Sequence, residues 1–378
     1  MAYTKENLND IFSRIAVKLD ISDTLFEIAN KEYTALGKWI DKESDDYSVS
    51  IYPQGSFALG TVIRPISDED DYDIDLVCEF AEQYGLSAKE LKQNVVKPWL
   101  ENYRHIDKIE EKRRCWHVEY SELNNFHMDV IPAYNKQIAI QITDLNEENG
   151  TYEYIDSNPK GYESWFMGCC KQRRLALYEQ YCKENSINCE DVDIEKLPKN
   201  KYKTPLQKAV QLLKRHRDIM FDGDDNKPIS IIITTLAGQL YNNEDNIVDA
   251  IATILSQAEH YIEKNKKSGN YFIENPSCKD DNFANKWNEY PERAKAFFSW
   301  LHAAQIFFDP NRLMNLDKIT MGREIKKTFG ENLGKTILNE MAEEERKSIE
   351  SGNYKVSAKV GGLALDGKIA VPPNHHHG

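Results

Sequence analysis

The sequence lacks the long apolar runs that mark membrane proteins. No run approaches the roughly 20 residues that a helix needs to cross a bilayer, and residues 1–30 lack the basic and then apolar pattern of a secretory signal. We therefore expect a soluble, cytoplasmic protein that does not bind membranes. At 378 residues the chain exceeds what one hydrophobic core usually serves, which predicts two lobes.

Cysteines are few and irregularly spaced. The seven cysteines form an odd set without a Cys-x-x-Cys pair, which favours reduced thiols over a disulfide framework. A zinc site of four thiolates is an alternative, although adjacent cysteines share one metal poorly; its ligands would be Cys169, Cys170, Cys182 and Cys189. No repeat of fixed period is present, which excludes solenoids.

Positive charge is in deficit. The chain has 48 Lys and Arg against 62 Asp and Glu, which gives a net charge of -14 and a pI near 5.2. A protein with this balance is repelled by the phosphates of long nucleic acids. Long RNA or DNA is therefore a poor candidate partner.

The first part of the chain predicts a mixed sheet preceded by helices. Apolar residues in 7–42 recur at mostly helical spacing with an interruption at 20–23, which predicts one or two long helices. A helix is also predicted at 87–103, and the polar stretch 144–161 is interpreted as a hinge between lobes. Short β-branched and aromatic runs predict strands at 49–52, 72–80, 114–120, 126–133 and 138–143.

The second part of the chain predicts an almost entirely helical lobe. Residues 230–240, SIIITTLAGQL, fit a buried strand or a buried helix, and their helical surroundings favour a helix. Helical periodicity is clear in 165–181, 205–221, 247–262, 283–308 and 321–341. The whole pattern predicts an α+β fold, with a sheet lobe preceded by helices in 1–160 and a helical lobe with a flexible C-terminal tail in 161–378.

Two aspartates in residues 52–80 form the strongest chemical signal. Asp73 and Asp75 alternate with apolar residues in a predicted strand, so both carboxylates point to one side, roughly 6.5 to 7 Å apart. Two such charges would repel by a few kcal/mol, a cost that a divalent cation removes. The alternative is a solvated acidic loop, which is what most charged runs are.

Asp129 fits the same geometry from another strand. It alternates with Met128 and Val130, so its carboxylate can join the first pair from a neighbouring strand. Hard oxygen ligands favour Mg²⁺ or Mn²⁺, and two such ions can bind both the attacking hydroxyl and the phosphate that is displaced. The three aspartates together therefore predict a metal site.

Two further segments suit anionic ligands. Gly55 permits close backbone approach to a phosphate, and Ser56 can hold anionic oxygens at a helix N-terminus; an ordinary glycine with a serine cap is the alternative. Residues 199–217 contain seven Lys or Arg and no acid, which fits either a solvated helix face or a triphosphate clamp. Arg215 and Arg217 have no assigned role in this interpretation.

The motifs QGSFALGT, DYDID and HMDVIPA, in residues 54–133, resemble the signature of DNA polymerase β-like nucleotidyltransferases. More narrowly, they resemble the bacterial cGAS/DncV-like nucleotidyltransferases, which synthesise cyclic di- and trinucleotide second messengers in anti-phage defence. QLLKRHRDIMF and KPISIIITTLA, in residues 211–237, are similar to the helical lobe of that family. The resemblance covers most of the chain.

The resemblance implies a polymerase β-like palm joined to an oligoadenylate-synthase-like helical lobe, with the active site in the cleft between them. It implies that ATP is a substrate, with GTP or other nucleoside triphosphates as candidate further substrates. Pyrophosphate would be the leaving group, and Asp129 would lie nearest the attacking hydroxyl. It also implies regulatory partners that are HORMA-like or ubiquitin-transfer-like proteins. When alone, the chain is expected to be a monomer. Two Mg²⁺ ions, or Mn²⁺, would be held by Asp73, Asp75 and Asp129, and the donor triphosphate by Gln54, Gly55, Ser56, Lys214 and Ser230.

Other interpretations stay open at this point. The protein could be a terminal nucleotidyltransferase that acts on RNA, protein or a small molecule, or a non-catalytic nucleotide-binding scaffold. The ending VPPNHHHG is either a tag remnant or a native tail whose Gly378 is a point of conjugation. Five other histidines show no metal-ligand spacing and are expected to be structural: His105, His117, His216, His260 and His302.

Overall fold

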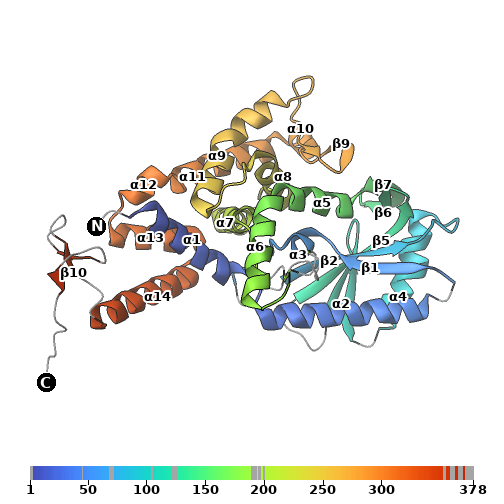
Figure 1. Ribbon diagram of the computed structural model, residues 1–378. Coiled ribbons are helices and arrows are strands. Elements are labelled where there is room, and N and C mark those ends of the chain that lie inside the picture. Colours follow the sequence, from blue (N-terminus) through green and yellow to red (C-terminus); the bar gives the residue numbers. More distant parts are fainter. Residues whose placement is uncertain are drawn as a thin grey trace.

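The computed structural model arranges the chain as a β-sheet region beside a helical region (Figure 1). It describes residues 3–44, 46–67, 72–103, 105–120, 126–188, 194, 197–198 and 201–351, and three short strands between 355 and 370. Among the helices so described, none is both long enough and apolar enough to cross a bilayer.

The two opening helices pack into different cores. The predicted break at 20–23 is confirmed, because α1 (Lys5–Leu19) ends before it and α2 (Asp23–Glu43) begins within it, capped by Ser22. Helix α1 buries its apolar face in the helical region, whereas α2 lies along the sheet (Figure 1). The first helix therefore belongs to the core that the helices after residue 158 build.

The sheet has seven strands in the order β1-β2-β5-β4-β3, with β6 added to β5 and β7 to β6. Strands β2 and β5 are parallel and the other pairs are antiparallel. The five predicted strands are confirmed, with bounds that differ by a few residues. The strands are β1 (Val49–Pro53), β2 (Tyr72–Phe80), β3 (Ile106–Glu111), β4 (Trp116–Tyr120), β5 (Phe126–Lys136), β6 (Ala139–Asn146) and β7 (Thr151–Ser157).

Two of these strands were not predicted. The interpretation of 144–161 as a hinge is wrong for most of its length, because β6 runs to Asn146 and β7 pairs with it over seven residues. β3 and β7 are polar strands at the edges of the sheet, so their apolar signal is weak and backbone pairing supplies the stability. The expected helix at 87–103 is a π-helical stretch, Glu90–Val96, followed by α4 (Lys97–Glu101).

The helical region follows the predicted periodicity, with more breaks. Residues 230–240 form a helix as expected, and the segments 165–181, 283–308 and 321–341 are each divided in two. Its helices are α5 (Pro159–Cys169), α6 (Lys171–Glu184), α7 (Pro205–Met220), α8 (Ser230–Leu240), α9 (Ile247–Lys264), α10 (Asn285–Glu289), α11 (Pro291–Phe307), α12 (Pro310–Met314), α13 (Lys318–Phe329) and α14 (Glu331–Glu350). Small strands are β8 (Glu274–Asn275), β9 (Cys278–Asn282), β10 (Lys355–Ser357), β11 (Gly362–Ala364) and β12 (Ile369–Ala370).

One face of α7 is anchored to the segment that follows β1. The short helix α3 (Gly55–Leu59) already bridges the cores, because Phe57 packs in the sheet core and Leu59 in the helical core. Four buried side chains of α7 then donate hydrogen bonds to backbone carbonyls at the end of α3 and just beyond it. The pairs are Gln207 with Leu59, Gln211 with Val62, Lys214 with Thr61 and Arg215 with Arg64, at 2.9, 2.7, 2.9 and 2.5 Å.

This arrangement corrects one alternative from the sequence. Lys214, Arg215 and Arg217 are buried, so the end of the basic stretch is not a solvated helix face. A buried cation is stable only where its charge and its hydrogen bonds are compensated, and here carbonyl oxygens compensate in part. The division of the chain near residue 160 stays a prediction.

The anchoring of α7 can be tested with Gln211→Met. The substitution keeps the side-chain length but leaves the buried Val62 carbonyl without its donor, so we expect the free energy of unfolding to fall by about 1–3 kcal/mol. Urea denaturation measures the change. Gln257→Met, on the exposed face of α9, is the control and should stay within about 0.5 kcal/mol of the wild type; equal stability of the two variants would contradict the anchoring role.

Candidate active site

The register of two parallel strands brings the three predicted aspartates together. Asp73 and Asp75 lie two residues apart on β2, and Asp75 is directly opposite Asp129 on β5. Alternation along each strand therefore places all three on one face of the sheet. One carboxylate oxygen from each lies within 4.8 Å of one from each of the others, a spacing at which oxygen ligands can share cations. We call these three residues the acidic triad.

The acidic triad carries more negative charge than its surroundings neutralise. Burial, together with the neighbouring carboxylates of Asp73 and Asp129, raises the pKa of Asp75 to about 8. A divalent cation that bound this carboxyl group would displace its proton to solvent, because the cation stabilises the ionised form. The donor set and its electrostatics thus fit a divalent ion.

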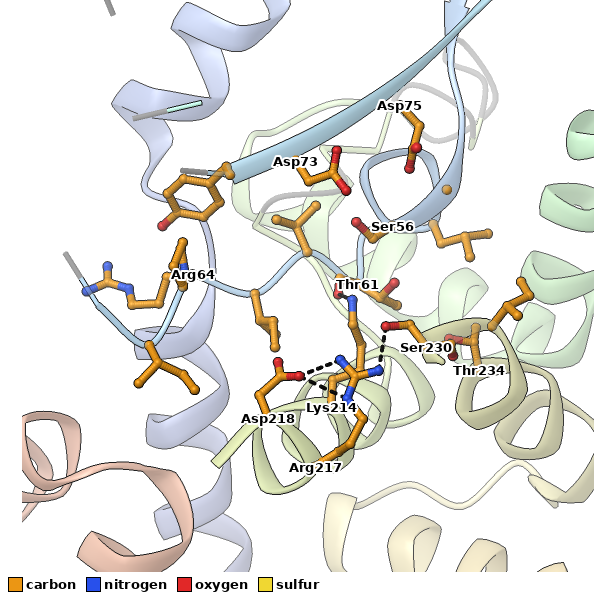
Figure 2. Close-up of a pocket in the computed structure, with 18 of the residues that line it drawn as sticks. Ser56, Thr61, Arg64, Asp73, Asp75, Lys214, Arg217, Asp218, Ser230 and Thr234 are labelled. Atoms are coloured by element: carbon orange, nitrogen blue, oxygen red, sulfur yellow. Dashed lines mark hydrogen bonds and ion pairs between the residues drawn. The ribbon is translucent and has the colours of Figure 1, made fainter. Parts of the chain in front are cut away.

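The segment before the triad is shaped around Asp75. The backbone N–H of Gln54 donates a hydrogen bond to the backbone carbonyl of Asp75 at 2.8 Å, which connects the start of α3 to β2. Gly55 has a φ of +59°, and a Cβ at this position would overlap Asp75 Oδ2. The close approach that requires glycine is therefore made by the Asp75 carboxylate itself. Ser56 follows at the edge of the cavity beside Asp73 (Figure 2).

A cavity of about 610 Å³ lies between the sheet and the helical region. Figure 2 shows Asp73, Asp75 and Ser56 on one side, with Lys214 and Ser230 on the other. Of the eight site residues predicted from the sequence, six line this cavity. Gln54 and Asp129 do not, although backbone pairing holds each of them against Asp75.

The helical side of the cavity carries positive charge. Burial and the neighbouring Arg217 guanidinium lower the pKa of Lys214 to about 8, while its Nζ donates to the Thr61 carbonyl. Arg217 donates to Ser230 Oγ at 2.8 Å and pairs with Asp218 at 2.6 Å (Figure 2). Ser230 thus positions Arg217, a residue that had no role in the sequence interpretation.

Several residues in or beside the cavity were missed from the sequence. Arg64 and Tyr72 also line the cavity, and nothing in their spacing marks them. His117 is not remote from the site, because its Nδ1 lies 2.8 Å from Asp129 Oδ1. His127 precedes Asp129 by two residues on the same strand, and this alternation was a signal that pointed to it.

The four-cysteine zinc site finds no support in the described part of the chain. The groups of residues there with metal-ligand spacing contain no cysteine. The buried Cys170 thiol donates instead to the carbonyls of Phe166 and Met167. Cys189 lies outside the described residues, as does the VPPNHHHG ending with Gly378.

This arrangement is that of a nucleotidyltransferase. The acidic triad lies on two parallel strands, Gly55 and Ser56 of α3 pack beside it, and α7 carries Lys214 and Arg217 on the other side of the cavity. The sequence profile of the family described as "Cyclic GMP-AMP synthase DncV-like, nucleotidyltransferase domain" matches residues 49–134, which contain the whole triad. A c-di-GMP synthase of Roseivirga ehrenbergii is 32% identical over 308 residues, 79% of this chain and 78% of the relative. The chain therefore belongs to the cGAS/DncV-like nucleotidyltransferases.

Solved structures share the two-lobed, polymerase β-like fold. CdnG of Bradyrhizobium diazoefficiens, solved in complex with GTP, aligns with a TM-score of 0.71 and 20% identity over 89% of this chain and 99% of its own. CdnC of E. coli MS115-1, solved in complex with HORMA-deltaN, aligns with a TM-score of 0.60 and 15% identity over 85% and 96% of the two chains. The predicted fold class is thus confirmed.

The raised pKa of Asp75 predicts how stability depends on pH in the absence of metal. The folded state keeps a proton up to about pH 8 that the unfolded chain releases near its ordinary pKa of 3.8, so this group's contribution to stability falls as pH rises between those values. Asp75→Asn removes the effect. We expect the variant to gain on the wild type by the order of a few kcal/mol between pH 5 and 8 in EDTA.

Urea denaturation at both pH values measures this difference. The exposed Asp107→Asn on β3 serves as the control and should follow the wild-type profile. Parallel profiles of stability against pH for the wild type and Asp75→Asn would show that the pKa of Asp75 is not raised in the folded protein.

Proposed function

We propose that this nucleotidyltransferase is a template-independent, Mg²⁺-dependent synthase that joins nucleoside triphosphates into a cyclic dinucleotide. The observation that supports this most is that Asp73 and Asp75 of the acidic triad line a cavity of about 610 Å³ whose opposite wall carries Lys214 and Arg217. The cavity lies within the usual range for small-molecule sites and provides carboxylates for cations and cations for phosphates.

The acidic triad would hold the Mg²⁺ ions, with Mn²⁺ as an alternative. Its ligands are all carboxylate oxygens, the donor type that both ions prefer. When bound, such ions neutralise charge on the transferring phosphate and make the attacking sugar hydroxyl more acidic. No imidazole or thiolate belongs to this set of three ligands, which is consistent with a hard cation.

The residues of the chain divide the remaining work. Gly55 lets the Asp75 carboxylate sit against α3, and Ser56 presents its hydroxyl to the donor triphosphate at the cavity edge. Lys214 and Arg217 attract the phosphates from the helical side. Asp129, opposite Asp75 in the sheet, would orient the attacking hydroxyl. Gln54 acts through its backbone contact with Asp75.

The choice of nucleotide rests on the relatives. The Roseivirga relative is named a c-di-GMP synthase, and CdnG was solved with GTP, so we infer that GTP is at least one substrate. The use of ATP and the formation of trinucleotides stay predictions from the resemblance. The same holds for anti-phage signalling, for the monomeric state and for HORMA-like or ubiquitin-transfer-like regulators; CdnC was solved in complex with HORMA-deltaN.

Incubation with the four labelled nucleoside triphosphates and Mg²⁺, followed by phosphatase treatment and mass spectrometry, tests the proposal. A phosphatase-resistant cyclic dinucleotide from nucleotides alone is the expected product. Label that appears only when RNA, protein or a small-molecule acceptor is added would favour a terminal nucleotidyltransferase. No turnover under any condition, with nucleotide still bound, would favour the scaffold.

Asp73→Asn and Asp75→Asn should each reduce product formation by at least about 100-fold, because each removes a ligand from the acidic triad. Both variants should stay folded, since loss of a carboxylate relieves repulsion within the triad. Product formation is followed by mass spectrometry and folding by circular dichroism. Asp107→Asn is the matched control, and full activity in both triad variants would contradict the proposal.

Lys214→Met separates phosphate binding from anchoring. The substitution removes a charge beside the cavity, so we expect the KM for nucleotide to rise by about tenfold or more, as charge-assisted hydrogen bonds contribute about 1.5–3 kcal/mol. Gln211→Met, which loses a similar carbonyl contact one turn earlier on α7 but no charge, should leave KM near the wild-type value. Equal changes of KM in both variants would show that Lys214 has a structural role and does not bind phosphate.

A further inference from the structure

Two histidines lie beside the acidic triad on the same face of the sheet. His127 is opposite Asp73 in the parallel pairing of β2 with β5, two residues before Asp129. His117 is opposite Asp129 in the antiparallel pairing of β4 with β5. Strand alternation therefore directs both imidazoles to the side where the carboxylates lie.

The side chains form a compact group. His117 Nδ1 is 2.8 Å from Asp129 Oδ1, and the two imidazole rings have centroids 4.2 Å apart at an angle of 51°. One ligand atom from each of His117, His127 and Asp129 lies within 4.8 Å of the other two, and all three residues are partly buried. This group and the acidic triad both fall within the same limit of 4.8 Å, and Asp129 belongs to both.

We propose that His117, His127 and Asp129 form a second cation site, which takes a borderline first-row transition ion such as Zn²⁺. Imidazole nitrogens suit such ions, whereas Mg²⁺ prefers oxygen ligands alone. Two histidines and one carboxylate, with a fourth position open, are also the ligand set of several zinc sites in proteins. An ion bound here competes with the acidic triad for the carboxylate of Asp129.

The alternative role is purely positional. His117 would then serve only to orient Asp129, and His127, whose Nε2 is 3.5 Å from Asp73 Oδ1, only to balance the charge of Asp73. That role predicts no affinity for Zn²⁺ beyond what the carboxylates supply. Metal binding therefore distinguishes the two roles, whether or not the protein makes a cyclic dinucleotide.

The experiment measures Zn²⁺ binding to the metal-free, full-length chain by isothermal titration calorimetry in millimolar Mg²⁺. Residues 375–377, three consecutive histidines, are changed to alanine in every sample because they would bind Zn²⁺ themselves. We expect one Zn²⁺ per chain that Mg²⁺ does not displace. His117→Asn and His127→Asn should each weaken its binding by at least about tenfold, as even outer-shell partners of a metal contribute that much.

His302→Asn is the matched control, since His302 pairs with Glu259 at 3.3 Å on the exposed surface of α11 and should not affect the site. Co²⁺ provides a second readout, because its d–d absorption should change in both site variants. Zn²⁺ affinity unchanged in both would overturn the proposal. So would Zn²⁺ binding that Asp73→Asn abolishes while the histidine variants keep it, because the ion would then sit in the acidic triad.

The two variants lie on different strands, so that if one fails to fold, as judged by circular dichroism, the other still decides the question. Failure of this proposal is distinct from failure of the proposed function. A protein that binds no Zn²⁺ can still form a cyclic dinucleotide with Mg²⁺, and one that forms no product can still bind Zn²⁺ at these residues.

Discussion

The parallel pairing of β2 with β5 is the constraint on which the site depends. It places Asp75 opposite Asp129, and a shift of one residue would turn Asp129 to the opposite face of the sheet. The apolar neighbours Ile74, Leu76, Met128 and Val130 are buried in the sheet core, so burial enforces this register. The packing of these apolar residues thus holds the carboxylates close together against their mutual repulsion.

The second requirement is that the helical region face the triad. Four side chains of α7 reach carbonyls in residues 59–64, and α3 places one apolar side chain in each core. Because the same segment leads from Gly55 to the cavity wall, contacts that stabilise the two regions also set the distance from Lys214 to the carboxylates. Lys214 itself makes one of these contacts and also lines the cavity, so its buried charge lies beside the cavity.

Much of this was predictable because local patterns are strong where a strand is half buried. Alternation located β2 and β5 closely and put Asp73, Asp75 and Asp129 on one face; the register that joins them agrees with that expectation. The polar edge strands β3 and β7 escaped prediction because their stability comes from pairing rather than from apolar side chains. His117 escaped for a related reason: its relation to Asp129 exists only across the β4–β5 ladder.

The order of amino acids thus suffices for the types of ligand, the faces on which they lie and the helical character of the second lobe, since these depend on neighbours a few residues apart. It does not suffice for the pairing of Arg217 with Ser230, the fit of Gly55 against Asp75 or the grouping of His117 with His127. Those contacts join residues distant in the chain. Only the packed chain sets such distances, because they follow from which strands and helices become neighbours.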